Sequence, residues 1–177
     1  MSKIVLIFGL ISGAILSAMM AITMLFVDAI GFDRSELIGY TSMVVAFLLI
    51  FFGIRSYRDN VAGGSVGFGR AFSVGALIVV VASLCYVVTW EVIYFNFAPD
   101  FTEKYQAHLI DKARAQGESQ AAIDKKVADM EKFAELYKNP AINASLTFLE
   151  PLPVGLIIAL VSAGILRRRP GVPGVAG

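Results

Sequence analysis

Three carboxylates stand in or beside long apolar stretches, where an ionisable side chain is costly unless it has a partner or a function. Asp28 ends the first stretch, Glu91 lies near the end of the third, and Glu150 lies within the fourth. At about 1.5 Å of rise per residue, Glu91 and Glu150 come to a similar depth in a bilayer. The three acids are therefore a candidate cation or proton site, which His108 could reach from the neighbouring segment. The alternative is that each acid pairs with a nearby lysine, hydroxyl or backbone group at the interface.

The chain offers few residues that could carry out metal-dependent or nucleophilic catalysis. It contains one cysteine and one histidine. A zinc site needs several such ligands, and a catalytic Ser/His/Asp or Cys/His set needs more than one isolated member. We therefore expect no enzyme activity, no metal and no cofactor. The formal charge of +1 also disfavours a nucleic-acid partner, which calls for a basic face.

A glycine-rich connection between the second and third apolar stretches carries three arginines, Arg55, Arg58 and Arg70. It lacks the Gly-Lys-Ser/Thr ending and the preceding strand of a phosphate-binding loop. The arginines therefore favour contacts with anionic lipid headgroups, although a specific ligand is the alternative. Asp59 is expected to pair with Arg55 or Arg58.

The elements that position these residues follow from composition. Of the 177 residues, 57% are hydrophobic and only 16% are charged, against about 25% charged in a soluble domain. About 20 apolar residues in a helix cross a bilayer. The sequence therefore predicts an all-α integral membrane protein whose residues 1–98 hold three transmembrane helices and whose residues 141–167 hold the fourth, with spans near 4–27, 37–54, 70–98 and 141–167.

Basic residues near the span ends predict the orientation, because cytoplasmic loops are enriched in them. In a four-span chain, one side receives the N-terminus, the second connection and the C-terminus, with Lys3, Arg55, Arg58, Arg70, Arg167, Arg168 and Arg169. Both termini are therefore predicted to be cytoplasmic. Residues 168–177 are rich in glycine and proline and are predicted to be a disordered cytoplasmic tail.

Residues 99–140 are predicted to form an extracytoplasmic helical hairpin. Eight of the 14 acids and seven of the 15 lysines and arginines fall there. Apolar residues recur every four positions from Phe101 to Ala113, Gly117 is a natural stop, and Ser119 is a plausible N-cap for a second helix. The hairpin either packs on itself or against the membrane surface, or it docks a protein partner.

Small residues recur every four positions in two spans, which lets helix backbones approach closely in lipid. The pattern favours packing inside the monomer's own bundle, and the alternative is the face of a homo-oligomer. The two stripes are Gly9, Gly13, Ser17 and Ala21 in the first span, and Gly155, Ala159 and Ala163 in the fourth.

The chain resembles an uncharacterised family of small four-span bacterial inner-membrane proteins, catalogued as a domain of unknown function. The resemblance is carried by the run from Phe52 to Asn60, the pairs Gly63-Gly64, Phe68-Gly69 and Ala71-Phe72, and the segment from Glu150 to Gly155. It implies a bacterial cytoplasmic (inner) membrane location. It brings no reaction, substrate or site residues.

Two functions are consistent with these features. The favoured one is a non-enzymatic accessory or scaffold protein that engages a partner or lipid. The alternative is a small oligomeric transporter or channel that uses the outer-leaflet carboxylates Glu91 and Glu150.

Overall fold

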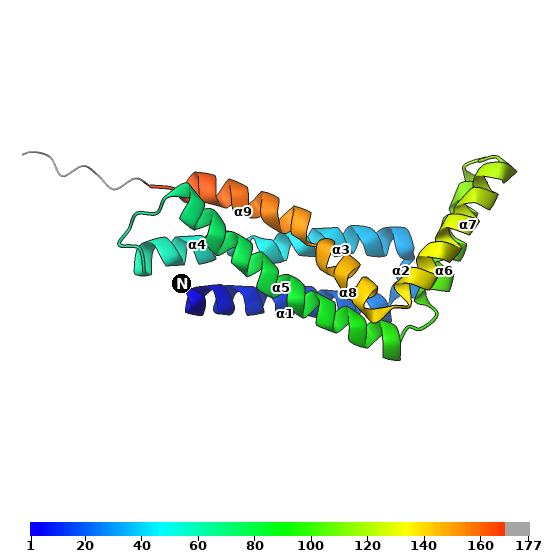
Figure 1. The fold of residues 1–177 in the computed structure, drawn as a ribbon, viewed down its shortest axis with the longest axis horizontal. Coiled ribbons are helices and arrows are strands. Elements are labelled where there is room, and N and C mark those ends of the chain that lie inside the picture. Colours follow the sequence, from blue (N-terminus) through cyan, green and yellow to red (C-terminus); the bar gives the residue numbers. More distant parts are fainter. Residues whose placement is uncertain (169–177) are drawn as a thin grey trace, which may run out of the picture.

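The structure, a computed structural model, describes residues 1–168 of the chain, and the regular elements of those residues are helices (Figure 1). The tail predicted for residues 168–177 lies outside the described residues except for Arg168. The helices are α1 (Ser2–Leu25), α2 (Val27–Ile30), α3 (Phe32–Phe47), α4 (Leu49–Asn60), α5 (Phe68–Asn96), α6 (Phe101–Ala115), α7 (Gln120–Tyr137), α8 (Pro140–Leu149) and α9 (Leu152–Leu166).

Within the described residues, four helical stretches are long and apolar enough to cross a membrane, which confirms the prediction of an all-helical, four-span chain. They are Ser2–Leu25, Phe32–Asn60, Phe68–Asn96 and Pro140–Leu166. The second stretch is longer than the predicted span of residues 37–54 at both ends. The reason is that an apolar run marks the part of a helix that lipid can cover, whereas the backbone hydrogen bonding continues into the charged turns beyond it. Glu36 consequently lies inside a helix rather than in a loop.

The fourth stretch is broken where α8 meets α9. Pro151 and Pro153 have no backbone N–H, so the carbonyls of Thr147 and Leu149 lose their usual helical donors. α8 therefore ends at Leu149 and α9 begins at Leu152. This break places Glu150 at a junction between two helices.

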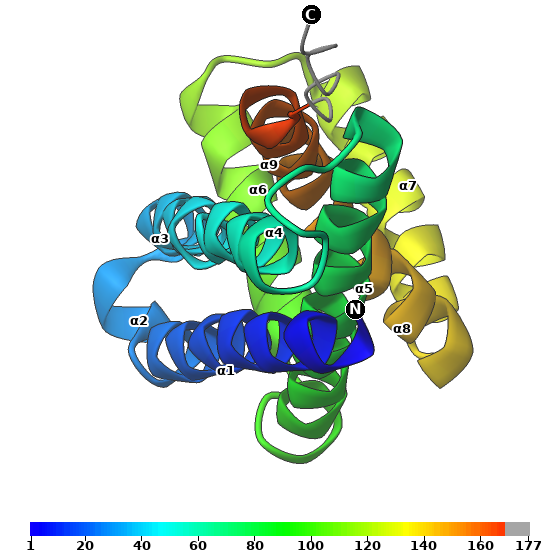
Figure 2. The same cartoon turned by 90° about the vertical axis from the view of Figure 1, so that its left-hand side faces the viewer.

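α5 is the central helix of the bundle, and α1, α4, α8 and α9 all pack against it (Figure 2). Its Ile78 and Val79 are fully buried, together with Phe47 and Ile50 from the second stretch. We call the end of the bundle that carries Met1, the connection at residues 61–67 and Arg168 the terminal end. There the Arg168 N–H donates to the Val66 carbonyl at 2.9 Å.

Glycines set how closely α1 and α9 approach α5. A Cβ placed on Gly13 would lie 2.7 Å from the Cβ of Cys85, and one on Gly155 would lie 2.6 Å from Cγ1 of Val79. The stripe in α9 continues inside the bundle with Ala159, which is fully buried. These contacts assign the small residues to packing within the chain.

α6 and α7 lie beyond the membrane-crossing helices, at the end opposite the termini, and we refer to them as the helix pair (Figure 1). Ser119 caps α7, because its Oγ accepts a hydrogen bond from the Ala122 N–H at 3.3 Å. The Gln106 side-chain amide donates to the Met130 carbonyl at 2.7 Å, which joins the two helices.

We expect Gly155→Ala to lower the midpoint of thermal unfolding in detergent micelles, because the new methyl group overlaps Val79. Overpacking of this kind costs about 1–3 kcal/mol. Gly164→Ala in the same helix is the matched control, since a Cβ there meets nothing within 4 Å. It should leave the midpoint unchanged or raise it. Equal midpoints for the two variants would contradict the close contact between α9 and α5.

Candidate functional site

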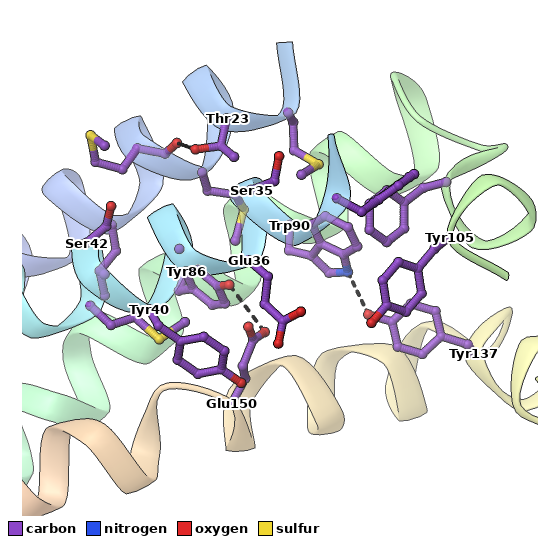
Figure 3. Close-up of a pocket in the computed structure, with 18 residues that line it drawn as sticks. Thr23, Ser35, Glu36, Tyr40, Ser42, Tyr86, Trp90, Tyr105, Tyr137 and Glu150 are labelled. Carbon is purple, nitrogen blue, oxygen red and sulfur yellow. Dashed lines mark hydrogen bonds between the residues drawn. The ribbon is translucent and has the colours of Figure 1, made fainter. Parts of the chain in front are cut away.

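A cavity of about 300 Å³ lies in the part of the bundle next to the helix pair (Figure 3). Residues of α1, α3, α5, α6, α7 and the α8–α9 junction line it. Pockets for small molecules begin at about this volume. The cavity is therefore large enough for a compact ligand or one segment of a longer one.

Two carboxylates from different helices stand at the mouth of the cavity. Glu36 comes from α3 and Glu150 from the α8–α9 junction, and both are exposed as well as lining the cavity. Figure 3 shows the two side chains directed into the same space. The Tyr86 hydroxyl donates a hydrogen bond to Oε2 of Glu150 at 3.2 Å, which orients that carboxylate. Tyr40 is also exposed at this edge, so the mouth lies between α3 and the junction.

Aromatic side chains form much of the wall nearest the helix pair. Trp90, which is buried, donates from Nε1 to the Tyr137 hydroxyl at 2.9 Å. The same hydroxyl lies 3.5 Å from the Thr147 hydroxyl. Phe101 and Tyr105 of α6 complete this wall. The helix pair is thus part of the cavity rather than a separate appendage.

The interior of the cavity is apolar and adaptable. Of the six methionines in the chain, four line it: Met19, Met20, Met24 and Met43. Unbranched thioether side chains fit ligands of varied shape. The serine and threonine hydroxyls in the wall are already used, because those of Thr23, Ser35 and Ser42 donate to the carbonyls four residues earlier in the chain, at 2.7, 2.9 and 2.7 Å.

The charge of the lining is one-sided. Within residues 1–168, no lysine, arginine or histidine lines the cavity, whereas Glu36 and Glu150 do. The neighbouring acids behave differently. Asp33 lies 2.7 Å from Nζ of Lys112, and Asp28 lies 3.8 Å from Nζ of Lys104.

These ion pairs attach α6 to the ends of α2 and α3. The hydrogen bond to Asp33 raises the pKa of Lys112, so the lysine keeps its proton. Hydrogen bonding to Asp100 is the main reason that the pKa of Lys104 is raised, with a smaller contribution from Asp28. Exposed pairs such as these contribute little to stability, because solvent screens them.

An aromatic cluster strengthens the attachment. The Phe32 ring of α3 lies 5.9 Å from that of Phe101, 5.5 Å from that of Tyr105 and 5.2 Å from that of His108, measured between centroids. His108 Nε2 also lies 3.3 Å from Asp33. α6 is therefore held over the cavity by its own apolar face.

The structure does not bring the three sequence-predicted acids together. Only Glu150 lines the cavity. Asp28 meets Lys104, and Oε1 of Glu91 is buried with no hydrogen-bond partner in the described part of the chain. Among residues 1–168 no three histidine, cysteine, aspartate or glutamate side chains are grouped so as to hold a metal ion. His108 lies against Asp33 instead of joining such a group.

Sequence reasoning missed Glu36 as a partner of Glu150. Glu36 directly precedes the predicted span of residues 37–54, a position where an acid needs no functional explanation. The signal that was present is the spacing of Glu36 and Tyr40, which places both on one face of a helix.

The three arginines at the terminal end differ in their surroundings. Arg58 is buried, with its side chain 10% exposed, and its Nε lies 2.6 Å from Asp59. Because it is covered by its own chain, it is poorly placed for the predicted headgroup contact. Arg55 is 58% exposed and lies 3.7 Å from Asp59. Arg70 is exposed, with Nη1 3.9 Å from Sδ of Met1.

No curated protein and no solved structure matches this chain. One family does, and it is described as "Protein of unknown function (DUF4199)". The match covers residues 7–168, which include all four membrane-crossing stretches from Ile7 onward and every residue of the cavity. The chain therefore belongs to the DUF4199 family of proteins of unknown function.

Proposed function

We propose that the protein is a non-enzymatic accessory protein of the bacterial cytoplasmic membrane that binds an amphipathic small molecule or lipid of the outer leaflet in its cavity. One observation carries the proposal: the cavity has a polar mouth, formed by Glu36 and Glu150, and a methionine-rich apolar interior. A ligand with one polar end and one apolar body matches that division.

The proposal includes an orientation in which both termini are cytoplasmic and the helix pair is outside. It is supported by the basic residues of the terminal end, since cytoplasmic connections are enriched in them. At the opposite end, in α2 and the first turns of α3, Arg34 is the one base beside the acids Asp28, Asp33 and Glu36. The cavity mouth then belongs to the outer half of the membrane.

The depth of the mouth fits the ligand class. The second membrane-crossing stretch has 29 residues, or about 43 Å of helix, against about 30 Å of hydrocarbon. Its first turns therefore extend into the headgroup region. Glu36 lies four residues after Phe32, so the carboxylates meet the leaflet near the level at which an amphiphile carries its polar end.

Binding is better supported than conduction. Between the cavity and the terminal end, Phe47, Ile50 and Ile54 are fully buried and pack with Val74 and Ile78 of α5. A transported molecule would have to separate these helices. The arrangement favours a molecule that enters and leaves on one side.

Labelling in intact cells tests the orientation. In a Cys85→Ser background, Gln120→Cys in the helix pair should react with a membrane-impermeant maleimide, because it lies outside. Ser65→Cys, in the connection between α4 and α5, should react only after the membrane is permeabilised. The reverse pattern would overturn the orientation and move the cavity mouth to the inner leaflet.

Energy transfer from Trp90 tests the ligand site. Trp90 is the chain's one tryptophan and lines the cavity. The neutral fluorophore phenylnaphthylamine, added to the full-length protein in lipid nanodiscs, should accept energy from Trp90 in a saturable manner.

Gly39→Phe should weaken this binding by at least about tenfold, because Gly39 lines the cavity and has open space where the ring would project. Gly164→Phe is the control, since Gly164 also has open space but lies outside the cavity. Transfer that never saturates, or that both variants retain, would reject the site.

A second candidate function, docking of an extracytoplasmic protein, is favoured by apolar side chains on the helix pair. Phe133 is 48% exposed and Leu136 is 56% exposed. A photo-cross-linking residue at position 136 should capture a defined partner or a second copy of the chain, whereas one at position 125 should not. Equal or absent capture at the two positions would reject the docking function.

A further inference from the structure

We infer that the ligand is an amphipathic cation whose ammonium head is held between Glu36 and Glu150. The inference rests on the proposed function and names the chemistry of the molecule bound. It is carried by the charge of the cavity, by the rings around the two acids and by the end of α8.

The first argument is charge complementarity. Asp28 and Asp33, at the same end of the bundle, each meet a lysine of α6. Glu36 is only three residues from Asp33, yet among residues 1–168 neither it nor Glu150 forms an ion pair. Lys112, whose charge interacts with that of Glu36, is hydrogen-bonded to Asp33 instead. The two carboxylates project into the same space, where like charges repel (Figure 3). A cation placed between them would relieve that repulsion, while an anion would increase it.

The second argument is the aromatic surroundings. Tyr40, Tyr86, Trp90, Tyr105 and Tyr137 surround the space into which the two carboxylates project (Figure 3). The negative faces of aromatic rings attract an alkylammonium group, and more strongly where water is displaced. Rings together with carboxylates are the combination by which proteins recognise quaternary and tertiary amines.

The third argument is the helix end beside Glu150. α8 ends at Leu149, and its C-terminus carries partial negative charge. Pro151 and Pro153 leave the carbonyls of Thr147 and Leu149 without their helical donors. The dipole of α8 is offset by the N-terminus of α9 at Leu152, so the junction's contribution is the two carbonyl oxygens, which can accept hydrogen bonds or face a cation.

The apolar interior of the cavity indicates the chemistry of the remainder of the ligand. The methionines of α1 and α3 offer contact to an alkyl or aromatic body and no hydrogen-bond donor. An ammonium head on an apolar body describes both a free amphipathic amine and a lipid with an ammonium headgroup. The two share one recognition chemistry and differ in their source.

Competition against phenylnaphthylamine tests the inference in the full-length protein. Nanodiscs of phosphatidylglycerol supply a bilayer without any ammonium group. Octyltrimethylammonium is compared with its neutral isostere, in which carbon replaces nitrogen, and nanodiscs without protein correct for partition. We expect the cation to displace the fluorophore from the wild-type protein at a concentration at least about tenfold lower than the isostere.

The matched variants are Glu36→Gln, Glu150→Gln and the two combined. Each single change should reduce the preference for the cation, and the double change should abolish it. Phenylnaphthylamine, being neutral, should bind all three, which shows that the cavity is intact. Glu103→Gln is the control, because Glu103 lies in a separate groove beside the helix pair, and it should keep the full preference.

The outcomes separate the inference from the function on which it rests. Equal displacement by cation and isostere, or an unchanged preference in the double variant, overturns the cation and leaves the ligand site standing. Absence of saturable phenylnaphthylamine binding overturns both. Adding phosphatidylethanolamine to the bilayer then identifies the source: competition supports a lipid headgroup as the cation, and its absence supports a free amine.

Discussion

The bundle depends on close contact between helices at small residues. In lipid, helices gain little from the hydrophobic effect, so their association depends on van der Waals contact at small residues. Gly13 and Gly155 let α1 and α9 approach α5 closely, and Phe47 fills the layer between them. Beside these contacts, Tyr86 and Trp90 of α5 line the cavity. The cavity therefore lies next to the tightly packed part of the bundle.

The polarity of the cavity follows that of the bilayer. Its carboxylates lie at the mouth, where a leaflet has its headgroups, and its methionines lie inside, where a leaflet has its chains. Under the proposed function, an amphiphile moving sideways between α3 and the α8–α9 junction would keep each of its parts in a matching environment. Exchange of such a ligand with the leaflet would then not require it to enter water.

Features that depend on neighbours in the chain were readable from the sequence, whereas those that depend on distant contacts were not. The four apolar stretches, the cap at Ser119 and the effect of Pro151 on the fourth span are local. Whether Glu91 or Glu36 faces a cavity depends on the rotation of each helix about its axis, which is set by packing against other helices. Because an apolar stretch has few polar positions, its sequence gives little indication of which side of the helix faces the interior of the bundle. The burial of Arg58 beside Asp59 is of the same kind, because it arises from how the connection folds back.

One wall of the cavity is formed by residues of α6 and α7, which lie beyond the membrane-crossing helices (Figure 1). Phe101 and Tyr105 contact Phe32 on one side and border the cavity on the other, and Tyr137 does so from α7. Any displacement of α6 or α7 therefore alters the affinity of the cavity, and by thermodynamic reciprocity an occupant biases the position of those helices. The position of the helix pair and the occupancy of the cavity are thus coupled, so that each influences the other.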